Sequence, residues 1–142
     1  MDTELKRQIM LENYSNPFHK ETKGEDYIKT NANNISCIDD INLYLKIENN
    51  IIKDAYFDGE ACAISTSSTS IMLKNIINKS INDVKKYINN FENMIYEKEY
   101  NKEILKEALV YDEIYKQENR KTCATLPYEA LKKALDKNKE IC

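Results

Sequence analysis

An alternation of apolar and polar side chains near residue 45 constrains the fold more than any other feature of this sequence. Apolar residues occupy every second position there, at Ile41, Leu43, Leu45 and Ile47. Because successive side chains of a β-strand point to opposite faces, this pattern predicts a strand at 41–48 with one buried face. A second strand is expected at 51–58, after Asn49 and Asn50, and the two strands are expected to form an antiparallel hairpin.

The register of the hairpin depends on the number of residues in its loop. A two-residue loop would place Asp54 and Asp58 on the apolar face of the first strand. A three-residue loop would instead place Ala55 and Phe57 on that face, opposite positions 43 and 41 or one step along. Because burial of one face specifies the register, we expect the three-residue loop.

Most of the remaining chain is expected to be helical. Helices are expected at 5–12 and 64–77, from Ile81, from Asn101 and from Thr125, with a short first strand at 27–32. Asn16-Pro17 ends the first helix, because the residue before a proline avoids the helical conformation. Thr125 is expected to cap the last helix, with Pro127 in its first turn. The hydroxyl side chains at 65–70 could be modified, but we expect them to allow close helix packing.

Composition excludes several classes of protein. A chain of 142 residues with 42% hydrophobic residues is expected to form one folded domain, spanning 1–142. The net charge of −3 and the dispersed basic residues argue against nucleic-acid binding. No apolar run approaches the ~20 residues of a membrane span, and no signal peptide is evident. We therefore expect a cytoplasmic protein without a membrane partner, in which the four cysteines stay reduced.

Three of the four cysteines lie at expected element boundaries rather than on apolar stripes. Cys37 precedes the hairpin, and Cys62 and Cys123 precede helices, where backbone N–H groups favour the thiolate. The expected register brings Cys37 to within about one residue of being opposite Cys62, with Asp39 pointing to the same side. Since the spacing contains no CxxC pair, both a shared metal site and separate structural cysteines remain open.

Two other residues with metal-binding side chains are expected to have no such role. His19, the single histidine, could be a ligand, but we expect a solvated imidazole in a polar loop at 18–26. Cys142 is expected to be a free tail thiol.

The stretch at 59–72, which reads Gly-Glu-Ala-Cys-Ala-Ile-Ser-Thr-Ser-Ser-Thr-Ser-Ile-Met, resembles the central motif of the SufU branch of the IscU/NifU N-terminal family. Three further segments are similar to motifs of that family in the same order. They are 12–17 (family His-Tyr-x-Asn-Pro), 37–39 (Cys-Gly-Asp) and 120–126 (Arg-x-Lys-Cys-Ala-Thr-Leu). The resemblance implies a role in iron–sulfur cluster assembly. It also implies an α+β fold, with about three antiparallel strands in a small sheet and helices packed on one face.

The resemblance further implies the SufU subtype and its zinc site. Thr122 precedes Cys123 where IscU scaffolds have histidine, and the segment at 79–118 is similar to the helical insertion of SufU-type proteins. SufU-type members bind zinc through three cysteines and an aspartate. Carried over to this chain, the zinc ligands are Cys37, Asp39, Cys62 and Cys123.

Sulfur chemistry follows from the same resemblance. Cys37 is expected to accept persulfide sulfur from a SufS-type cysteine desulfurase, and Arg120 to help engage that enzyme. Downstream partners would be a cluster scaffold or apo-protein acceptors. Ile38 and Ala61 depart from the family pattern, which has glycine at both positions.

Three functions are compatible with these observations. The first is a zinc-dependent sulfurtransferase that feeds cluster assembly. The second is a scaffold on which an iron–sulfur cluster is built, because cysteine thiolates bind iron as well as zinc. The third is a zinc-stabilised interaction module without sulfur chemistry.

Overall fold

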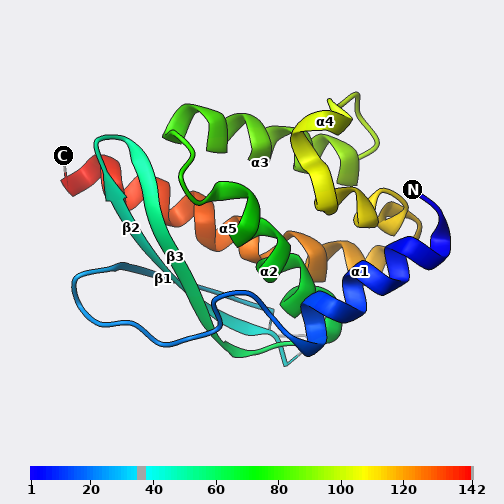
Figure 1. The fold of residues 1–142 in the computed structure, drawn as a ribbon, viewed down its shortest axis with the longest axis horizontal. Coiled ribbons are helices and arrows are strands. Elements are labelled where there is room, and N and C mark those ends of the chain that lie inside the picture. The colour runs from blue at the N-terminus through cyan, green and yellow to red at the C-terminus, as the bar shows by residue number, and fades with distance from the viewer. Residues whose placement is uncertain (35–37, 142) are drawn as a thin grey trace.

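The computed structural model describes residues 1–34 and 38–141, and side chains as far as residue 139. Its α-helices and strands are, in chain order, α1 (Thr3–Ser15), β1 (Ile28–Asn33), β2 (Asp40–Glu48), β3 (Ile51–Glu60), α2 (Ala63–Ile76), α3 (Ile81–Ile95), α4 (Lys102–Leu105) and α5 (Glu118–Ile141). Two short 3₁₀ helices, η1 (Lys106–Tyr111) and η2 (Ile114–Lys116), connect α4 to α5. Figure 1 shows the strands as one twisted layer, with α5 passing behind the hairpin of β2 and β3.

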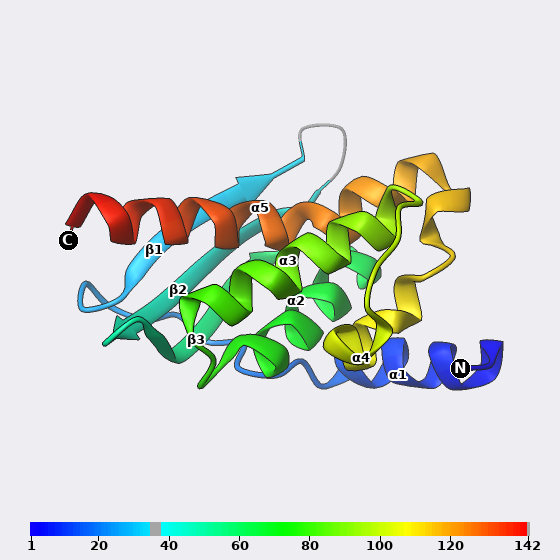
Figure 2. The ribbon, with the colours of Figure 1, turned by 90° about the horizontal axis from the view of Figure 1, so that it is seen from above.

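The described strands form one antiparallel sheet in the order β1-β2-β3. Helix α5 packs on β1 and β2, and α2 contacts β3, so helices cover one face of the sheet (Figure 2). Helix α1 packs along α2. The expected α+β fold, with a small antiparallel sheet and helices on one face, is confirmed. Among the described helices, none combines the length and the apolar character needed to cross a membrane.

The hairpin has the expected strands but not the expected loop. Asn49 and Asn50 form a two-residue turn, and both have positive φ angles of 53° and 60°, as a type I′ turn requires. A bulge then shifts the register, because Ile47 pairs with Ile52 whereas Lys46 pairs with Asp54. The three-residue loop was therefore wrong, since the extra residue lies within β3.

The bulge places the apolar side chains of β3 on the same face of the sheet as those of β2. Ala55 lies opposite Leu45, and Phe57 lies opposite Leu43, which is one step along from the first pairing considered. All four side chains are at most 2% exposed. The prediction that Ala55 and Phe57 face the core is confirmed.

At its far end, β3 requires a glycine. Gly59 has a φ of +112°, and a Cβ atom there would lie 2.0 Å from the carbonyl oxygen of Asp40. Only glycine adopts this conformation readily and leaves room for so close an approach of β2. Gly59 thus keeps the strands paired up to Glu60, two residues before Cys62.

Several helix ends follow the predicted signals. The side chain of Asp2 accepts a hydrogen bond from the Leu5 N–H and caps α1, which ends at Asn16 before the proline. Ser80 caps α3 and Asn101 caps α4 in the same way. Short polar side chains thus set the starts of these three helices.

The start of the last helix was predicted wrongly. Helix α5 begins at Glu118, so Thr125 lies inside it and donates to the Lys121 carbonyl at 3.1 Å. Pro127 is also inside α5, where its missing N–H leaves the carbonyl of Cys123 without its usual helical donor. The hydroxyl of Ser65 in α2 lies 2.9 Å from that carbonyl oxygen and can donate to it. A contact between helices therefore replaces the lost bond and allows the helix to continue through the proline.

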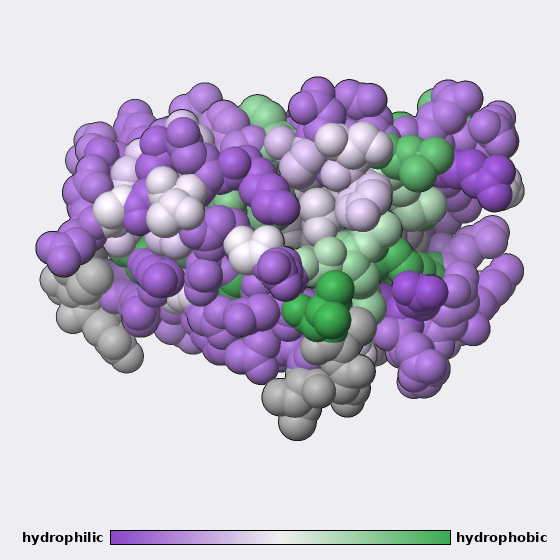
Figure 3. All heavy atoms as spheres, turned by 90° about the horizontal axis from the view of Figure 1, so that it is seen from below, coloured by the Kyte–Doolittle hydropathy of each residue, from purple (hydrophilic) through white to green (hydrophobic). Residues whose placement is uncertain are grey.

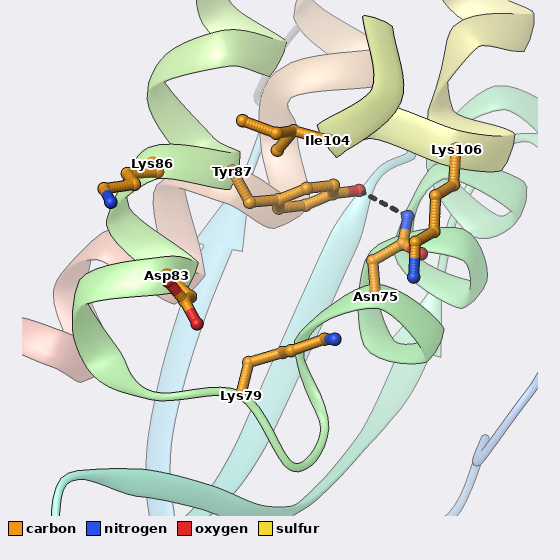
Figure 4. A pocket seen from close by; sticks show the side chains of 7 residues that line it. All are labelled: Asn75, Lys79, Asp83, Lys86, Tyr87, Ile104 and Lys106. Carbon is orange, nitrogen blue, oxygen red and sulfur yellow. Dashed lines mark hydrogen bonds between the residues drawn. The ribbon is translucent and has the colours of Figure 1, made fainter. Parts of the chain in front are cut away.

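A cavity of about 180 Å³ lies at the C-terminal end of α2, as Figure 4 shows. It is lined by Asn75, Lys79, Asp83, Lys86, Tyr87, Ile104 and Lys106. The Asn75 amide donates to the Tyr87 hydroxyl at 3.0 Å, and that hydroxyl is also hydrogen-bonded to Tyr128 at 2.7 Å. No cysteine or histidine lines this cavity, so it lacks the sulfur and nitrogen ligands that zinc prefers.

Candidate metal centre

Three side chains capable of binding a metal meet beside the open end of the hairpin. Asp39 directly precedes β2, Cys62 caps α2, and Cys123 lies in the second turn of α5. Their ligand atoms all lie within 4.8 Å of one another. Segments that lie 23 to 84 residues apart in the sequence thus contribute to one site, as the shared-site hypothesis requires.

Cys62 takes the place of the oxygen-bearing residue that usually caps a helix. Its backbone is extended, with φ −66° and ψ 170°, and its Sγ accepts the N–H of Ser65 at 3.4 Å. The helix dipole places partial positive charge at this end of α2, which favours a negatively charged sulfur. The predicted placement of this thiol at a helix start is confirmed.

Asp39 is 1% exposed, and each of its carboxylate oxygens has a donor. Oδ1 accepts the Cys62 N–H at 2.7 Å, and Oδ2 accepts the Ser65 hydroxyl at 2.8 Å. Burial by itself raises the pKa of Asp39, but the bonds from Cys62 and Ser65 outweigh it and hold the pKa below its ordinary value. The carboxylate is therefore ionised at neutral pH. Oδ2 lies 3.6 Å from the sulfur of Cys62.

Cys123 differs from the prediction made for it. It was expected at a helix boundary, but the earlier start of α5 places it inside the helix, where it is 4% exposed. Burial, and after it the neighbouring Cys62 and Asp39, raise the pKa of the Cys123 thiol to about 12. Without a cation this thiol is neutral at pH 7. A bound cation reverses the effect, because it attracts the thiolate more strongly than burial disfavours it.

These donors fit a zinc ion. Zinc prefers cysteine sulfur, histidine nitrogen and carboxylate oxygen in a tetrahedral arrangement, with Zn–S of about 2.3 Å and hence S···S of about 3.8 Å. Two thiols and one ionised carboxylate within 4.8 Å supply three such donors after a small contraction. The same donors also suit iron. Cys37, the fourth predicted ligand, lies outside the described residues.

Arg120 lies in the first turn of α5, three residues before Cys123. Its side chain is exposed and forms no ion pair within the ranges 1–34 and 38–139. A free guanidinium at this position remains available to a partner, and its predicted role stays a prediction.

His19 is neither a ligand of this site nor the solvated imidazole that was expected. Its ring stacks between Phe18 and Tyr56, with centroid distances of 3.8 and 4.4 Å. Nδ1 is hydrogen-bonded to the Ala55 carbonyl at 2.9 Å. The imidazole thus fastens the loop after α1 to strand β3.

Ser65 is the residue of the site that sequence reasoning missed. It belongs to the run 65–70, in which every side chain is buried and every hydroxyl forms a hydrogen bond. These residues were expected to allow close packing, and they do lie where α2 packs on α1 and α5. The signal for Ser65 was its spacing, since a residue three positions after a helix cap has its N–H directed at the cap side chain.

A groove adjoins the site on the surface. Its lining comes from α1, β3, α2 and the loops that flank them, and comprises Tyr14, Ser15, Pro17, Lys20, Ile38, Gly59, Glu60, Ala61 and Thr66. Ile38 is 69% exposed and Tyr14 is 47% exposed. Figure 3 shows neutral and apolar surface between hydrophilic areas on one face of the molecule.

The fold and the site together define a class of protein: a small α+β protein whose thiol–carboxylate cluster can hold a metal ion. Residues 5–141 match the NifU-like N terminal domain, and the chain belongs to that family.

Relatives and solved structures agree with this assignment. A zinc-dependent sulfurtransferase SufU of Bacillus subtilis is 36% identical over 138 residues, covering 96% of this chain and 92% of the relative. An iron-sulfur cluster assembly scaffold protein IscU of Thermotoga maritima is 38% identical over 104 residues, which is 73% of each chain. The crystal structure of a putative SUF-system scaffold protein from Fervidobacterium islandicum superposes with a TM-score of 0.85 at 28% identity, covering 90% of this chain and 94% of the other.

Proposed function

We propose that this protein serves iron–sulfur cluster assembly as a zinc-dependent sulfurtransferase that accepts persulfide sulfur from a cysteine desulfurase. The observation that carries the proposal is the convergence of Asp39, Cys62 and Cys123 within 4.8 Å. The similarity to a zinc-dependent sulfurtransferase over 96% of the chain supports it. Cys37 completes the proposed ligand set, being two residues from Asp39 in sequence.

Cys37 is also the proposed sulfur acceptor. Its thiolate attacks the outer sulfur of the persulfide on the desulfurase, and the sulfur–sulfur bond of that persulfide breaks. The electron pair stays on the desulfurase cysteine as a thiolate, and a new sulfur–sulfur bond forms on Cys37. The exchange needs no external oxidant or reductant.

The described residues prepare the site for this exchange. Asp39 is held ionised by the Cys62 N–H and the Ser65 hydroxyl, and the start of α2 stabilises negative charge on Cys62. Bound zinc would keep the coordinated thiols deprotonated at neutral pH. Arg120, exposed one turn before Cys123, would engage a SufS-type desulfurase and offset the negative charge of the ligands. The sulfur would then pass to a cluster scaffold or an apo-protein.

The acceptor role can be tested with a SufS-type desulfurase and ³⁵S-labelled cysteine. We expect label on the wild-type chain that reductant removes, and no label on Cys37→Ser, with the far-UV circular dichroism unchanged. Cys142→Ser, a change in the proposed tail thiol, is the matched control and should accept label normally. Full transfer to Cys37→Ser would contradict the assignment.

A cluster scaffold is the second candidate function. It is favoured by the 38% identity to an IscU scaffold protein, because the same thiolates can bind iron. Anaerobic reconstitution with iron and sulfide separates the two functions, since a stable and transferable cluster would favour the scaffold. Metal analysis of protein purified without added metal should find zinc if the first proposal holds. Desulfurase turnover that does not change when the protein is added would instead favour a zinc-stabilised interaction module.

A further inference from the structure

Ser65 lies within hydrogen-bond distance of all three of the described metal-binding residues. Its backbone N–H donates to the sulfur of Cys62 at 3.4 Å, and its hydroxyl lies 2.8 Å from Oδ2 of Asp39 and 2.9 Å from the carbonyl oxygen of Cys123. The residue is fully buried, at 0% exposure. Its hydrogen bonds are therefore made inside the protein and not to bulk solvent.

The two acceptors compete for a single proton. A serine hydroxyl has one O–H to donate, whereas both the Asp39 carboxylate and the Cys123 carbonyl only accept. The Cys123 carbonyl needs a donor from outside α5, because Pro127 has no N–H to form the usual helical hydrogen bond with it. The Ser65 hydroxyl thus lies between the Cys123 carbonyl of α5 and the Asp39 carboxylate before β2, within hydrogen-bond distance of each.

We propose that Ser65 is a positioning residue for the metal site, which sets Oδ2 of Asp39 at the distance from Cys62 and Cys123 that a metal ion requires. This inference rests on the proposed metal site and adds to it a residue that does not itself bind the metal. Oδ2 lies 3.6 Å from the Cys62 sulfur while it accepts the serine hydroxyl. A carboxylate oxygen can accept that bond and still offer a lone pair to a cation.

The first test compares two serines of the same helix. Ser68 lies one turn after Ser65 and donates to the Ala124 carbonyl of α5 at 2.7 Å, whereas no hydrogen bond joins its hydroxyl to Asp39, Cys62 or Cys123. We expect Ser65→Ala to weaken zinc binding by about 10–100-fold, the range typical of residues that orient metal ligands. Ser68→Ala should bind zinc as the wild type does. Zinc affinity is measured by competition with a chromophoric chelator, and the ligand field by the visible spectrum after Co²⁺ substitution.

A second variant protects this test against a failure to fold. In Pro127→Ala, the residue at position 127 regains an N–H that can donate to the Cys123 carbonyl, so α5 no longer depends on Ser65. The double variant Ser65→Ala/Pro127→Ala should therefore fold, as judged by circular dichroism. It should retain the loss of zinc affinity, because the bond to Asp39 is still missing.

A double-mutant cycle with Asp39→Asn shows whether Ser65 acts through Asp39. If it does, Ser65→Ala should weaken zinc binding strongly in the wild-type background and little in the Asp39→Asn background. Equal losses in both backgrounds, or zinc binding by Ser65→Ala equal to that of Ser68→Ala, would overturn the inference and leave the proposed function standing. Failure of the wild type to bind zinc would overturn both.

Discussion

The two halves of helix α2 are equally buried but are held in the protein by different forces. Its first half carries six consecutive hydroxyl residues at 65–70, whereas its second half buries Ile71, Met72, Leu73 and Ile76. The hydroxyls of Ser65, Ser68 and Ser70 form directed bonds to the segment before β2, to α5 and to α1, respectively. The apolar residues belong to the main hydrophobic core. Directional bonds specify positions, and apolar burial supplies free energy, so the half that borders the metal site is the half built for geometry.

The largest expected effect is the loss of the metal site from the first half. Cys62→Ala removes both a ligand and the cap of α2, and we expect zinc bound to the purified protein to fall below detection in elemental analysis. The fold should persist, because the apolar half of α2 is untouched. Cys142→Ala is the matched control and should retain zinc fully. Retention of zinc by Cys62→Ala at the wild-type level would show that the metal binds elsewhere.

The next largest effect is expected in the second half of α2, where a substitution should lower stability and leave zinc binding unchanged. Leu73→Ala should lower the free energy of unfolding by about 2–5 kcal/mol, because Leu73 is 0% exposed and its truncation leaves a cavity. Urea unfolding followed by circular dichroism measures the loss. Zinc affinity of the folded protein should be unchanged. Lys74→Ala, at the neighbouring exposed position, should change stability by less than about 1 kcal/mol.

A smaller effect is expected where the first half of α2 binds α1. The Ser70 hydroxyl donates to the Asn13 side chain at 2.7 Å and accepts the N–H of Phe18 at 2.9 Å. Ser70→Ala leaves both groups without this partner and should cost about 1–3 kcal/mol of stability. Amide hydrogen exchange should become faster in α1 but not in α5. If zinc affinity fell as well, the separation between Ser70 and the metal site would be disproved.

The smallest effect appears only at alkaline pH and concerns the far end of α2, where Asn75 bonds Tyr87. Burial raises the pKa of Tyr87 to about 12, whereas an unfolded tyrosine titrates near 10. Between these values the unfolded chain has released its proton and the folded chain has not, so stability is full below pH 10 and falls as the pH rises toward 12. Tyr87→Phe should make unfolding less dependent on pH in this window. Thermal unfolding at pH 9 to 11 measures the difference, and an unchanged slope would contradict it.

The fold was predictable where the apolar and polar residues of a single element show which of its faces is buried. The alternation at 41–48 identified the hairpin and its buried face, because a wrong register would have buried Asp54 and Asp58. The bulge that delivers this register was not predictable, since a two-residue turn plus one extra residue in β3 buries the same side chains as a three-residue loop.

The sequence predicted the metal-binding residues of the site better than the helix boundaries and contacts around them. Resemblance brought Asp39, Cys62 and Cys123 together, and these three do converge. The start of α5 was missed because Thr125 and Pro127 form a local start signal, while the bond that lets the helix run through the proline comes from α2. The role of Ser65 depends on that same contact, which no local pattern contains.

The proline inside α5 has a consequence for how the two cysteines move. In most helices the main-chain carbonyls are hydrogen-bonded within the helix. At Cys123 the carbonyl instead contacts the hydroxyl of Ser65 in α2, three positions after Cys62. We therefore expect small shifts of α5 against the sheet to leave the separation of the two sulfurs nearly unchanged. Separating these sulfurs requires breaking a buried contact, so the gap between them is protected from motions elsewhere in the molecule.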